Sequence, residues 1–105
     1  MAYKSIITDR AEELLDRLVY YLLIDLRNEQ AASHLLNGIS KLYDRIEDNP
    51  LQFPECRDFV LKSKGYREAV LTDMGYLVIF RIEEDTVYIV GVFHELENYS
   101  NKVHQ

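Results

Sequence analysis

Residues 75–94 read GYLVIFRIEEDTVYIVGVFH, and this stretch decides the fold. Two runs rich in β-branched and aromatic residues, 76–83 and 87–94, are separated by the short polar link Glu-Asp-Thr, which predicts two strands joined as a β-hairpin. The first run is almost entirely apolar. A strand of that composition is either central in its sheet or covered on both faces.

A third strand is predicted on the N-terminal side of this hairpin. Residues 66–71, YREAVL, have the composition of a strand, and the link TDMG is short and polar enough for a second hairpin. Residues 51–65 show no periodicity, so they are predicted to form a loop. Four apolar side chains are expected to pin this loop to the body of the protein: Phe53, Phe59, Val60 and Leu61.

The first half of the chain carries two helical patterns. Apolar residues recur at helical spacing across residues 9–26 and 28–48. Asp9 and Asn28 are predicted to cap the two helices, and the second helix should end before Pro50, which forces the preceding residue out of the α region. Because the link is short, the helices should pack antiparallel. Extra apolar residues widen the first stripe, so this helix is expected to be covered on more than one side: Tyr20, Tyr21, Leu23 and Ile24.

Residues 4–8 precede the first helix and have the β-branched composition of a short strand. The element order is therefore β-α-α-β-β-β. This order predicts an α+β fold in which a helical hairpin packs on one face of a mainly antiparallel sheet. The chain has 105 residues, the length of one domain, so a single domain is expected to span residues 1–105.

The charge balance is acidic, with 12 Lys and Arg residues against 18 Asp and Glu residues and a net charge of −6. Since nucleic-acid phosphates are bound mainly by Lys and Arg, this balance argues against a broad nucleic-acid surface. The single cysteine, Cys56, cannot form an internal disulfide, and no apolar run has the length of a signal peptide or a membrane span. These features predict a cytoplasmic protein that does not enter a membrane.

Sharp catalytic motifs are lacking: the chain has no P-loop, dinucleotide-binding glycine pattern, HExxH, CxxC or nucleophile elbow. His34, His94 and His104 do not have the spacing of metal ligands. We therefore expect no metal and no cofactor. His34 lies beside the apolar stripe of the second helix and is interpreted as a surface or boundary residue.

His94 is the polar residue that ends the last predicted strand. Its imidazole titrates near neutral pH, so it is a candidate general base or acid that Glu95 and Glu97 could orient. The alternative is that His94 only marks the end of the strand. Alternation along the strand places three residues on the same face as His94: Val92, Val90 and Tyr88.

Two arginines and one tyrosine are further candidates. Arg67 and Arg81 lie within predicted strands, where a charged side chain needs a ligand, a partner or solvent. The alternative for each is an exposed position paired with a nearby glutamate. Tyr99 is either a hydrogen-bonding site residue or one of several tyrosines that only pack.

The C-terminal half resembles the RelE/ParE superfamily of type II toxins, the toxin halves of bacterial toxin–antitoxin modules, which include plasmid stabilisation proteins. The family pattern is a strand with an arginine, a Tyr-x-x-x-Tyr/Phe-Arg-Ile strand, an acidic turn and a Val-x-x-Val-x-His/Arg strand. The matching segments are Tyr66-Arg67, Tyr76 to Ile82, Glu83 to Asp85, and Val90 to His94. The helical hairpin fits as well, so the resemblance covers nearly the whole chain.

The resemblance implies one of two activities. RelE-type members cut mRNA on the ribosome with a cluster of basic residues and a C-terminal tyrosine. The tyrosine corresponds to Tyr99, but the basic positions fall on an acid, two aliphatic residues and one histidine: Glu68, Val70, Leu77 and His94. Cleavage through a 2′-hydroxyl needs a base and cations, which valine and leucine do not supply. The ParE branch, whose members lack this cluster and inhibit DNA gyrase by binding, therefore fits better.

The resemblance thus implies a growth-inhibiting toxin that acts by binding DNA gyrase rather than as an enzyme. The first alternative is a ribosome-dependent endoribonuclease in which His94 is the base, Arg67 or Arg81 the phosphate-binding cation and Tyr99 the orienting residue. The second is a non-toxic module that only binds an antitoxin. None of these activities requires a small-molecule substrate.

A cognate antitoxin is the partner that the resemblance implies most directly. Family antitoxins lay a C-terminal segment across the helical hairpin and the sheet. Tyr20, Tyr21 and Tyr43 would offer aromatic anchor surface on the helices for such a segment. The alternative for each tyrosine is that it packs against the protein's own sheet.

Overall fold

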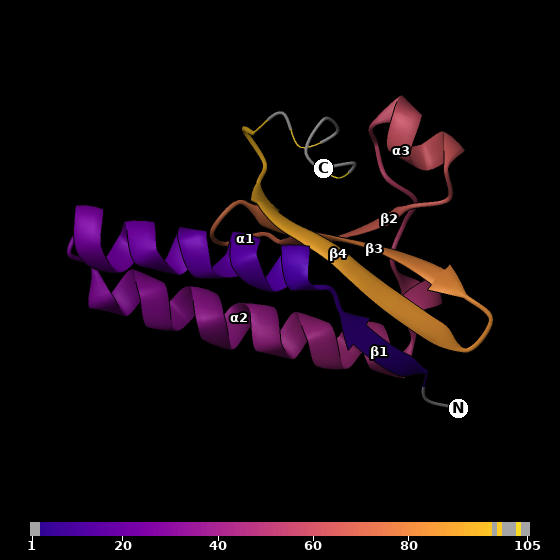
Figure 1. Cartoon of the computed structure of the whole chain (residues 1–105), viewed down its shortest axis with the longest axis horizontal. Coiled ribbons are helices and arrows are strands. Elements are labelled where there is room, and N and C mark those ends of the chain that lie inside the picture. The colour runs from indigo at the N-terminus through magenta and orange to yellow at the C-terminus, as the bar shows by residue number, and fades with distance from the viewer. Residues whose placement is uncertain (1–2, 98, 100–102, 104–105) are drawn as a thin grey trace.

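The computed structural model describes residues 3–97, 99 and 103 (Figure 1). Four strands form one sheet in the order β1-β4-β3-β2. β3 pairs antiparallel with β2 and with β4, whereas β1 runs parallel to β4 at one edge. The strands are β1 (Lys4–Ile7), β2 (Arg67–Leu71), β3 (Tyr76–Glu83) and β4 (Thr86–His94), each within about one residue of its predicted bounds.

Two long helices pack side by side on one face of the sheet (Figure 1). They are α1 (Asp9–Tyr20), which continues into the π-helical turn η1 (Tyr21–Asp25), and the antiparallel α2 (Glu29–Asp48). We call the face that they cover the hairpin face and the other the opposite face. The predicted α+β fold, with a helical hairpin on a mainly antiparallel sheet, is confirmed.

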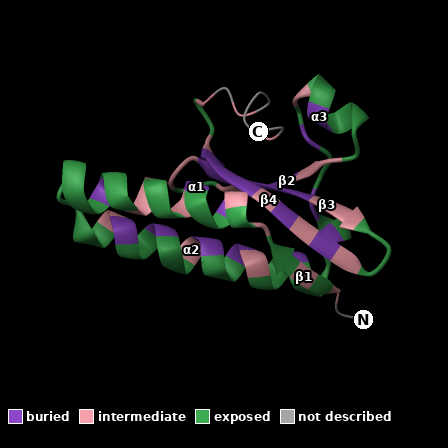
Figure 2. Cartoon of the chain, in the orientation of Figure 1, coloured by how far each residue is buried: buried purple, intermediate pink, exposed green. Residues whose placement is uncertain are grey.

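The core lies on both faces of β3, whose residues from Tyr76 to Phe80 are all buried (Figure 2). Val78 and Phe80 join the cluster that α1 and α2 cover, and Leu77 and Ile79 join a second cluster on the opposite face. The prediction that this strand is central in its sheet or covered on both faces is confirmed on both counts, because β3 also lies between β4 and β2. Burial of both faces explains why the run is apolar at every position rather than at alternate ones.

The segment that the sequence predicted to be a loop packs against both faces of the sheet: Phe53 joins the hairpin-face cluster, whereas Cys56 and Leu61 join the opposite-face cluster. It contains the 3-10 turn η2 (Pro50–Gln52) and the short helix α3 (Phe59–Ser63). The Asp58 carboxylate caps α3 by accepting from the Leu61 N–H at 3.0 Å, and the Leu61 side chain is fully buried. The loop prediction was wrong because one helical turn is too short to show a periodic stripe.

The N-caps of the two long helices were predicted with mixed success. Asn28 caps α2 by accepting from the Ala31 N–H, as predicted. The cap of α1 is Thr8 and not Asp9: the Thr8 hydroxyl accepts from the Ala11 N–H at 3.1 Å and donates to the carbonyl of Ile89 at 3.0 Å. Thr8 therefore caps the helix and ties it to β4, which no local pattern could reveal.

Candidate functional site

A β-bulge decides which face His94 occupies. Ile79 pairs with Gly91 while the next residue of β3, Phe80, pairs with Ile89, so Val90 is an extra residue in β4. Alternation therefore changes phase at Val90. His94 shares the hairpin face with Val92, but Val90 and Tyr88 lie on the opposite face, so the predicted shared face of these residues was wrong.

The His94 ring contacts residues at the end of its own strand and on the neighbouring strand. The His94 and Tyr76 rings meet edge to face, with a centroid distance of 5.2 Å and an angle of 90° between their planes. Nδ1 accepts from the backbone N–H of Leu96 at 3.2 Å, so a neutral imidazole carries its proton on Nε2 and keeps no free lone pair. Glu97 accepts from the His94 backbone N–H at 2.7 Å. In this arrangement His94 packs on Tyr76 and binds the backbone just after β4.

Both candidate arginines contact neighbouring protein groups. Arg67 lies on the hairpin face, where its guanidinium donates to the carbonyl of Phe53 at 2.7 Å and so ties the segment after η2 to β2. Arg81 lies on the opposite face, 4.3 Å from the centroid of the Tyr88 ring, and pairs with Glu83 at 2.9 Å. A cation–π contact and an ion pair are the partners expected for an arginine on a strand.

Tyr99 lies on the opposite face, where its ring stacks on Phe93 with centroids 5.9 Å apart. Burial raises the pKa of Tyr99, and the nearby Glu68 carboxylate raises that pKa further. Glu68 is only 2% exposed and accepts two hydrogen bonds from Arg57, one from its backbone N–H and one from Nε. A buried acid therefore occupies the neighbourhood of Tyr99.

The four candidate catalytic residues do not form one cluster. His94 and Arg67 share the hairpin face but pair with different residues of β3, His94 with Tyr76 at its start and Arg67 with Phe80 near its middle. Arg81 and Tyr99 lie on the opposite face. On that face the positions that would be basic in an RNA-cutting relative present the Glu68 carboxylate and the side chains of Val70 and Leu77, which pair across β2 and β3.

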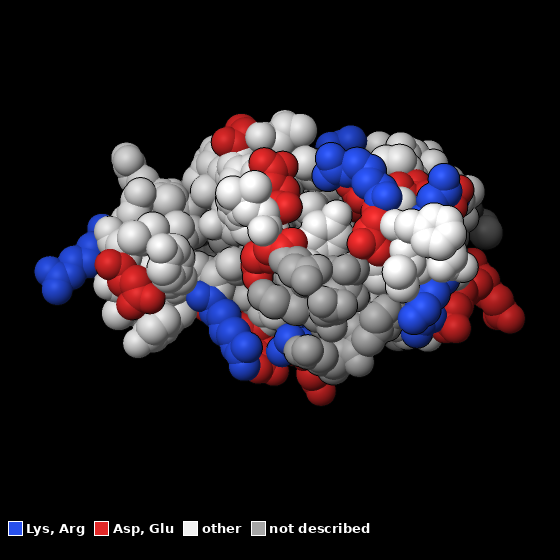
Figure 3. All heavy atoms as spheres, turned by 90° about the horizontal axis from the view of Figure 1, so that it is seen from above, with Lys and Arg blue, Asp and Glu red and all other residues white. Residues whose placement is uncertain are grey.

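Surface charge is mixed on the side of the sheet that carries α3. Viewed from above, Lys and Arg side chains lie in separate groups among Asp and Glu rather than in one continuous patch (Figure 3). Among residues 3–97, 99 and 103, no three His, Cys, Asp or Glu side chains are grouped so that they could hold a metal ion. None of the helices in this same part of the chain is long and apolar enough to cross a membrane.

Exposed aromatic surface lies where α1 continues into η1. Tyr20 is 61% and Tyr21 50% exposed, and further large apolar side chains stand beside them in solvent: Leu23, Ile24 and Leu26. The predicted cover over this side of the helix is not provided by the described part of the chain. π-Helical turns often mark functional sites, because the wider turn changes the direction in which successive side chains point.

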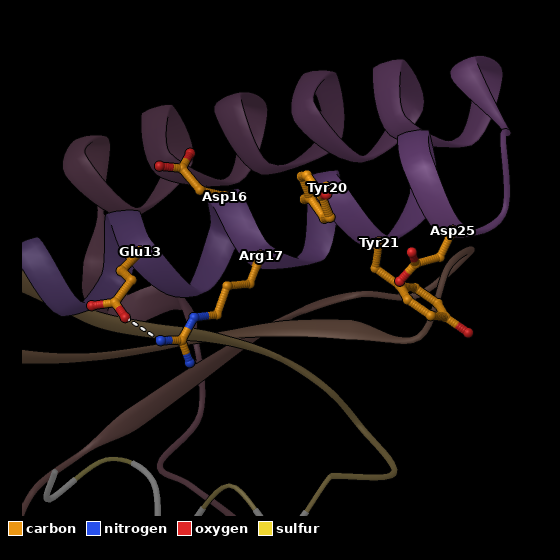
Figure 4. Close-up of a pocket in the computed structure, with 6 residues that line it drawn as sticks. All are labelled: Glu13, Asp16, Arg17, Tyr20, Tyr21 and Asp25. Carbon is orange, nitrogen blue, oxygen red and sulfur yellow. Dashed lines mark hydrogen bonds and ion pairs between the residues drawn. The ribbon is translucent and has the colours of Figure 1, made fainter.

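A shallow pocket of about 350 Å³ opens on this surface (Figure 4). Both exposed tyrosines line it, together with three carboxylates and one guanidinium: Glu13, Asp16, Asp25 and Arg17. Arg17 pairs with Glu13, as the dashed line in Figure 4 shows. The pocket thus combines aromatic walls with an excess of negative charge.

Tyr43 has a different environment from the other two tyrosines. It packs against the core between the helices and the sheet, and its hydroxyl is buried without a hydrogen-bond partner among the described residues. Burial, and secondarily the Glu12 carboxylate, raises the pKa of Tyr43 to about 12. Its placement matches the packing alternative, whereas Tyr20 and Tyr21 face solvent.

The segment around α3 contains exposed apolar residues that the sequence interpretation assigned to the core. Phe53 and Leu61 are buried as predicted, but Phe59 is 81% exposed and Val60 47%. The expectation that Phe59 and Val60 pin the segment was wrong. The spacing of Asp58 before Leu61 could have indicated the helical turn that points these two side chains outward.

Comparison with known proteins places this fold in a family. Residues 6–99 match the family described as ParE toxin of the type II toxin–antitoxin system parDE. No curated protein sequence matches the chain.

Solved structures share the fold at low sequence identity. The chromosomal ParDE system from P. aeruginosa aligns with a TM-score of 0.69 and 18% identity over 89% of this chain and 96% of that one. The toxin–antitoxin complex RelBE2 from Mycobacterium tuberculosis aligns with a TM-score of 0.60 and 18% identity over 90% and 99%. A mutant of the E. coli toxin RelE in the free state aligns with a TM-score of 0.62 and 15% identity over 99% and 92%. Since the family match spans nearly all of the chain, this protein belongs to the ParE toxin family of type II toxin–antitoxin systems.

Proposed function

We propose that this toxin inhibits growth by binding an essential protein, DNA gyrase as the resemblance implies, and that it does not cut mRNA. One observation carries the proposal: on the opposite face the Glu68 carboxylate is buried and already accepts two hydrogen bonds from Arg57, and the neighbouring positions hold the aliphatic side chains of Val70 and Leu77. Cleavage through a 2′-hydroxyl needs a base and cations. The engaged Nδ1 of His94 supports the same conclusion.

The test is to express the chain alone in bacteria and to follow growth, plasmid supercoiling and mRNA ends together. We expect growth arrest with loss of negative supercoiling and no new mRNA 5′ ends in primer extension. New ribosome-dependent ends would instead favour the endoribonuclease. Harmless expression of a folded chain would favour the non-toxic antitoxin-binding module.

We also propose that a cognate antitoxin neutralises the toxin in the cytoplasm by covering the exposed surface of α1 and η1. Two solved relatives, the ParDE system and the RelBE2 complex, are named as toxin–antitoxin pairs. Tyr20 and Tyr21 offer aromatic anchors, and the carboxylates of the neighbouring pocket fit a basic side chain on the partner.

The antitoxin surface is tested by replacing Tyr20 and Tyr21 together with alanine. We expect antitoxin affinity to fall at least about tenfold, because aromatic anchors dominate such interfaces, while toxicity without antitoxin persists. Leu51→Ala is the matched control, since Leu51 is an exposed apolar residue on η2, which follows α2 at the end away from the link between η1 and α2. Unchanged affinity in the double variant would remove this surface from the interface.

A further inference from the structure

The segment that carries α3 is held firmly to the sheet. The Cys56 N–H donates to the carbonyl of Tyr66 at 3.0 Å, and the Glu68 N–H donates to the carbonyl of Pro54 at 3.1 Å. Leu61 and Cys56 are buried in the opposite-face cluster. The conformation of this segment is therefore fixed by backbone hydrogen bonds and by apolar packing rather than left to solvent.

The tip of this firmly held segment presents apolar side chains to water. Phe59 and Val60 follow the Asp58 cap and point away from the buried Leu61, and Figure 2 shows α3 as largely exposed. Burying a phenylalanine is among the most favourable apolar contributions that a side chain can make. A well-ordered segment that keeps the Phe59 side chain in solvent, rather than in the protein's own core, is typical of an anchor residue at a protein interface.

Cations outnumber anions in the segment that carries these two apolar residues. Residues 57–64 contain three cations, Arg57, Lys62 and Lys64, against the single anion Asp58, on a chain whose net charge is −6. The Arg57 side chain is 68% exposed even though it binds Glu68. In the view from above, Lys and Arg side chains lie on more than one side of an uncharged projection at the α3 end of the molecule, with Asp and Glu side chains also near it (Figure 3).

We propose that residues 57–64, which we call the α3 knob, dock the toxin onto its protein target. Phe59 and Val60 would enter an apolar pocket on the target, and the cations would face an acidic rim around that pocket. The inference rests on the proposed function, because it assumes a cellular target. It assigns that target to the side of the sheet away from α1 and α2, so target and antitoxin contact different surfaces (Figure 1).

A protein partner fits the knob better than a nucleic acid. Phe59 could stack on a base, but its exposed neighbour Val60 has no ring, and Asp58 places a carboxylate beside the cations where a phosphate would be repelled. The cations are few and the knob is apolar at its centre, which is the composition of a protein interface with a charged rim.

The test compares three purified and expressed variants with the wild-type toxin: Phe59→Ser, Lys62→Glu and the control Leu51→Ser, which replaces another exposed apolar residue outside the knob. We expect growth inhibition to fall at least about tenfold for Phe59→Ser and to fall less for Lys62→Glu. Leu51→Ser should remain fully toxic. All three should keep the wild-type melting temperature, because their side chains are exposed, and should bind antitoxin within about twofold of wild type.

The outcomes separate the two proposals. Equal toxicity of Phe59→Ser and wild type would overturn the α3 knob alone, whereas a harmless wild-type chain would overturn the proposed function and the knob together. Loss of antitoxin binding in folded Phe59→Ser would assign the knob to the antitoxin and overturn its role toward the target. Salt-dependent binding of wild type to RNA or duplex DNA that Phe59→Ser abolishes would overturn the assignment of a protein partner.

Discussion

Arg57 binds Glu68 twice: the Arg57 backbone N–H donates to Oε1 at 2.8 Å, and Nε donates to Oε2 at 2.9 Å. The carboxylate is buried, whereas most of the arginine side chain remains in solvent. The pair links β2 to the segment that leads into α3. It also places a satisfied acid on the face where RNA-cutting relatives would need a cation.

Replacing Glu68 with glutamine should destabilise the protein. The substitution keeps the shape but removes the charge that both hydrogen bonds use, and bonds to a charged group contribute about 1.5–3 kcal/mol each, so we expect the free energy of unfolding to fall by about 1–3 kcal/mol. Urea denaturation measures the change. Glu55→Gln is the control, because Glu55 is exposed and should change stability by less than about 0.5 kcal/mol. Equal effects for the two variants would show that Arg57 contributes nothing through Glu68.

Replacing Tyr43 with phenylalanine should stabilise the protein at neutral pH. The Tyr43 hydroxyl is buried without a partner among the described residues, and an unsatisfied buried hydroxyl is unfavourable by about 1–3 kcal/mol. We expect a gain of about 1 kcal/mol in thermal or urea unfolding. A loss of stability would contradict the placement of this hydroxyl.

The same variant should alter the alkaline limit of stability. The pKa of Tyr43 rises from 10.0 to about 12 on folding, so the folded state holds the proton more tightly. The contribution of this protonated hydroxyl to the free energy of unfolding is complete below pH 10 and is lost as the pH rises through 12. Burial also raises the pKa of Cys56, but this cysteine is present in both the wild type and the Tyr43→Phe variant and so does not affect the difference between them. The advantage of Tyr43→Phe should therefore grow from pH 10 to pH 12, which unfolding at a series of pH values would show.

Replacing Thr8 with alanine should weaken the junction between β1 and α1. The hydroxyl caps α1 and also donates to the carbonyl of Ile89 on β4, so we expect a loss of about 1–2 kcal/mol in urea unfolding. Asp9→Ala tests the residue that the sequence pattern favoured as the cap. It should lose only about 0.5 kcal/mol, because Asp9 acts through the helix dipole alone.

Replacing His94 with asparagine should leave toxicity within about twofold of wild type, because a residue outside the chemistry contributes no catalytic factor of the usual ~10²–10⁴. Growth after induction measures toxicity, and His34→Asn, on the exposed side of α2, is the matched control. If toxicity fell about a hundredfold for His94→Asn but not for His34→Asn, with the fold intact, His94 would have a catalytic role.

The fold could be predicted from the sequence because its signals are local. The apolar runs of β3 and β4, the short polar turns and the helical stripes each lie within one element, and their order left only the α+β arrangement. The helix α3 was missed because one turn carries no stripe. Thr8 was missed as a cap because threonine and aspartate are both common at the N-cap of a helix. Only the hydrogen bond from the Thr8 hydroxyl to the carbonyl of Ile89 on β4 favours Thr8.

By itself, then, the sequence determined the four strands and the two long helices, their order and the resemblance to the toxin superfamily. The tertiary structure alone decided which residues meet. One extra residue in β4, Val90, changes the phase of alternation and moves His94 to the face away from Tyr99. Likewise, only packing buried Glu68 and the Tyr43 hydroxyl while leaving Tyr21 and Phe59 in solvent. The physical reason is that burial depends on contacts between distant segments, whereas periodicity reports only a residue's neighbours along the chain.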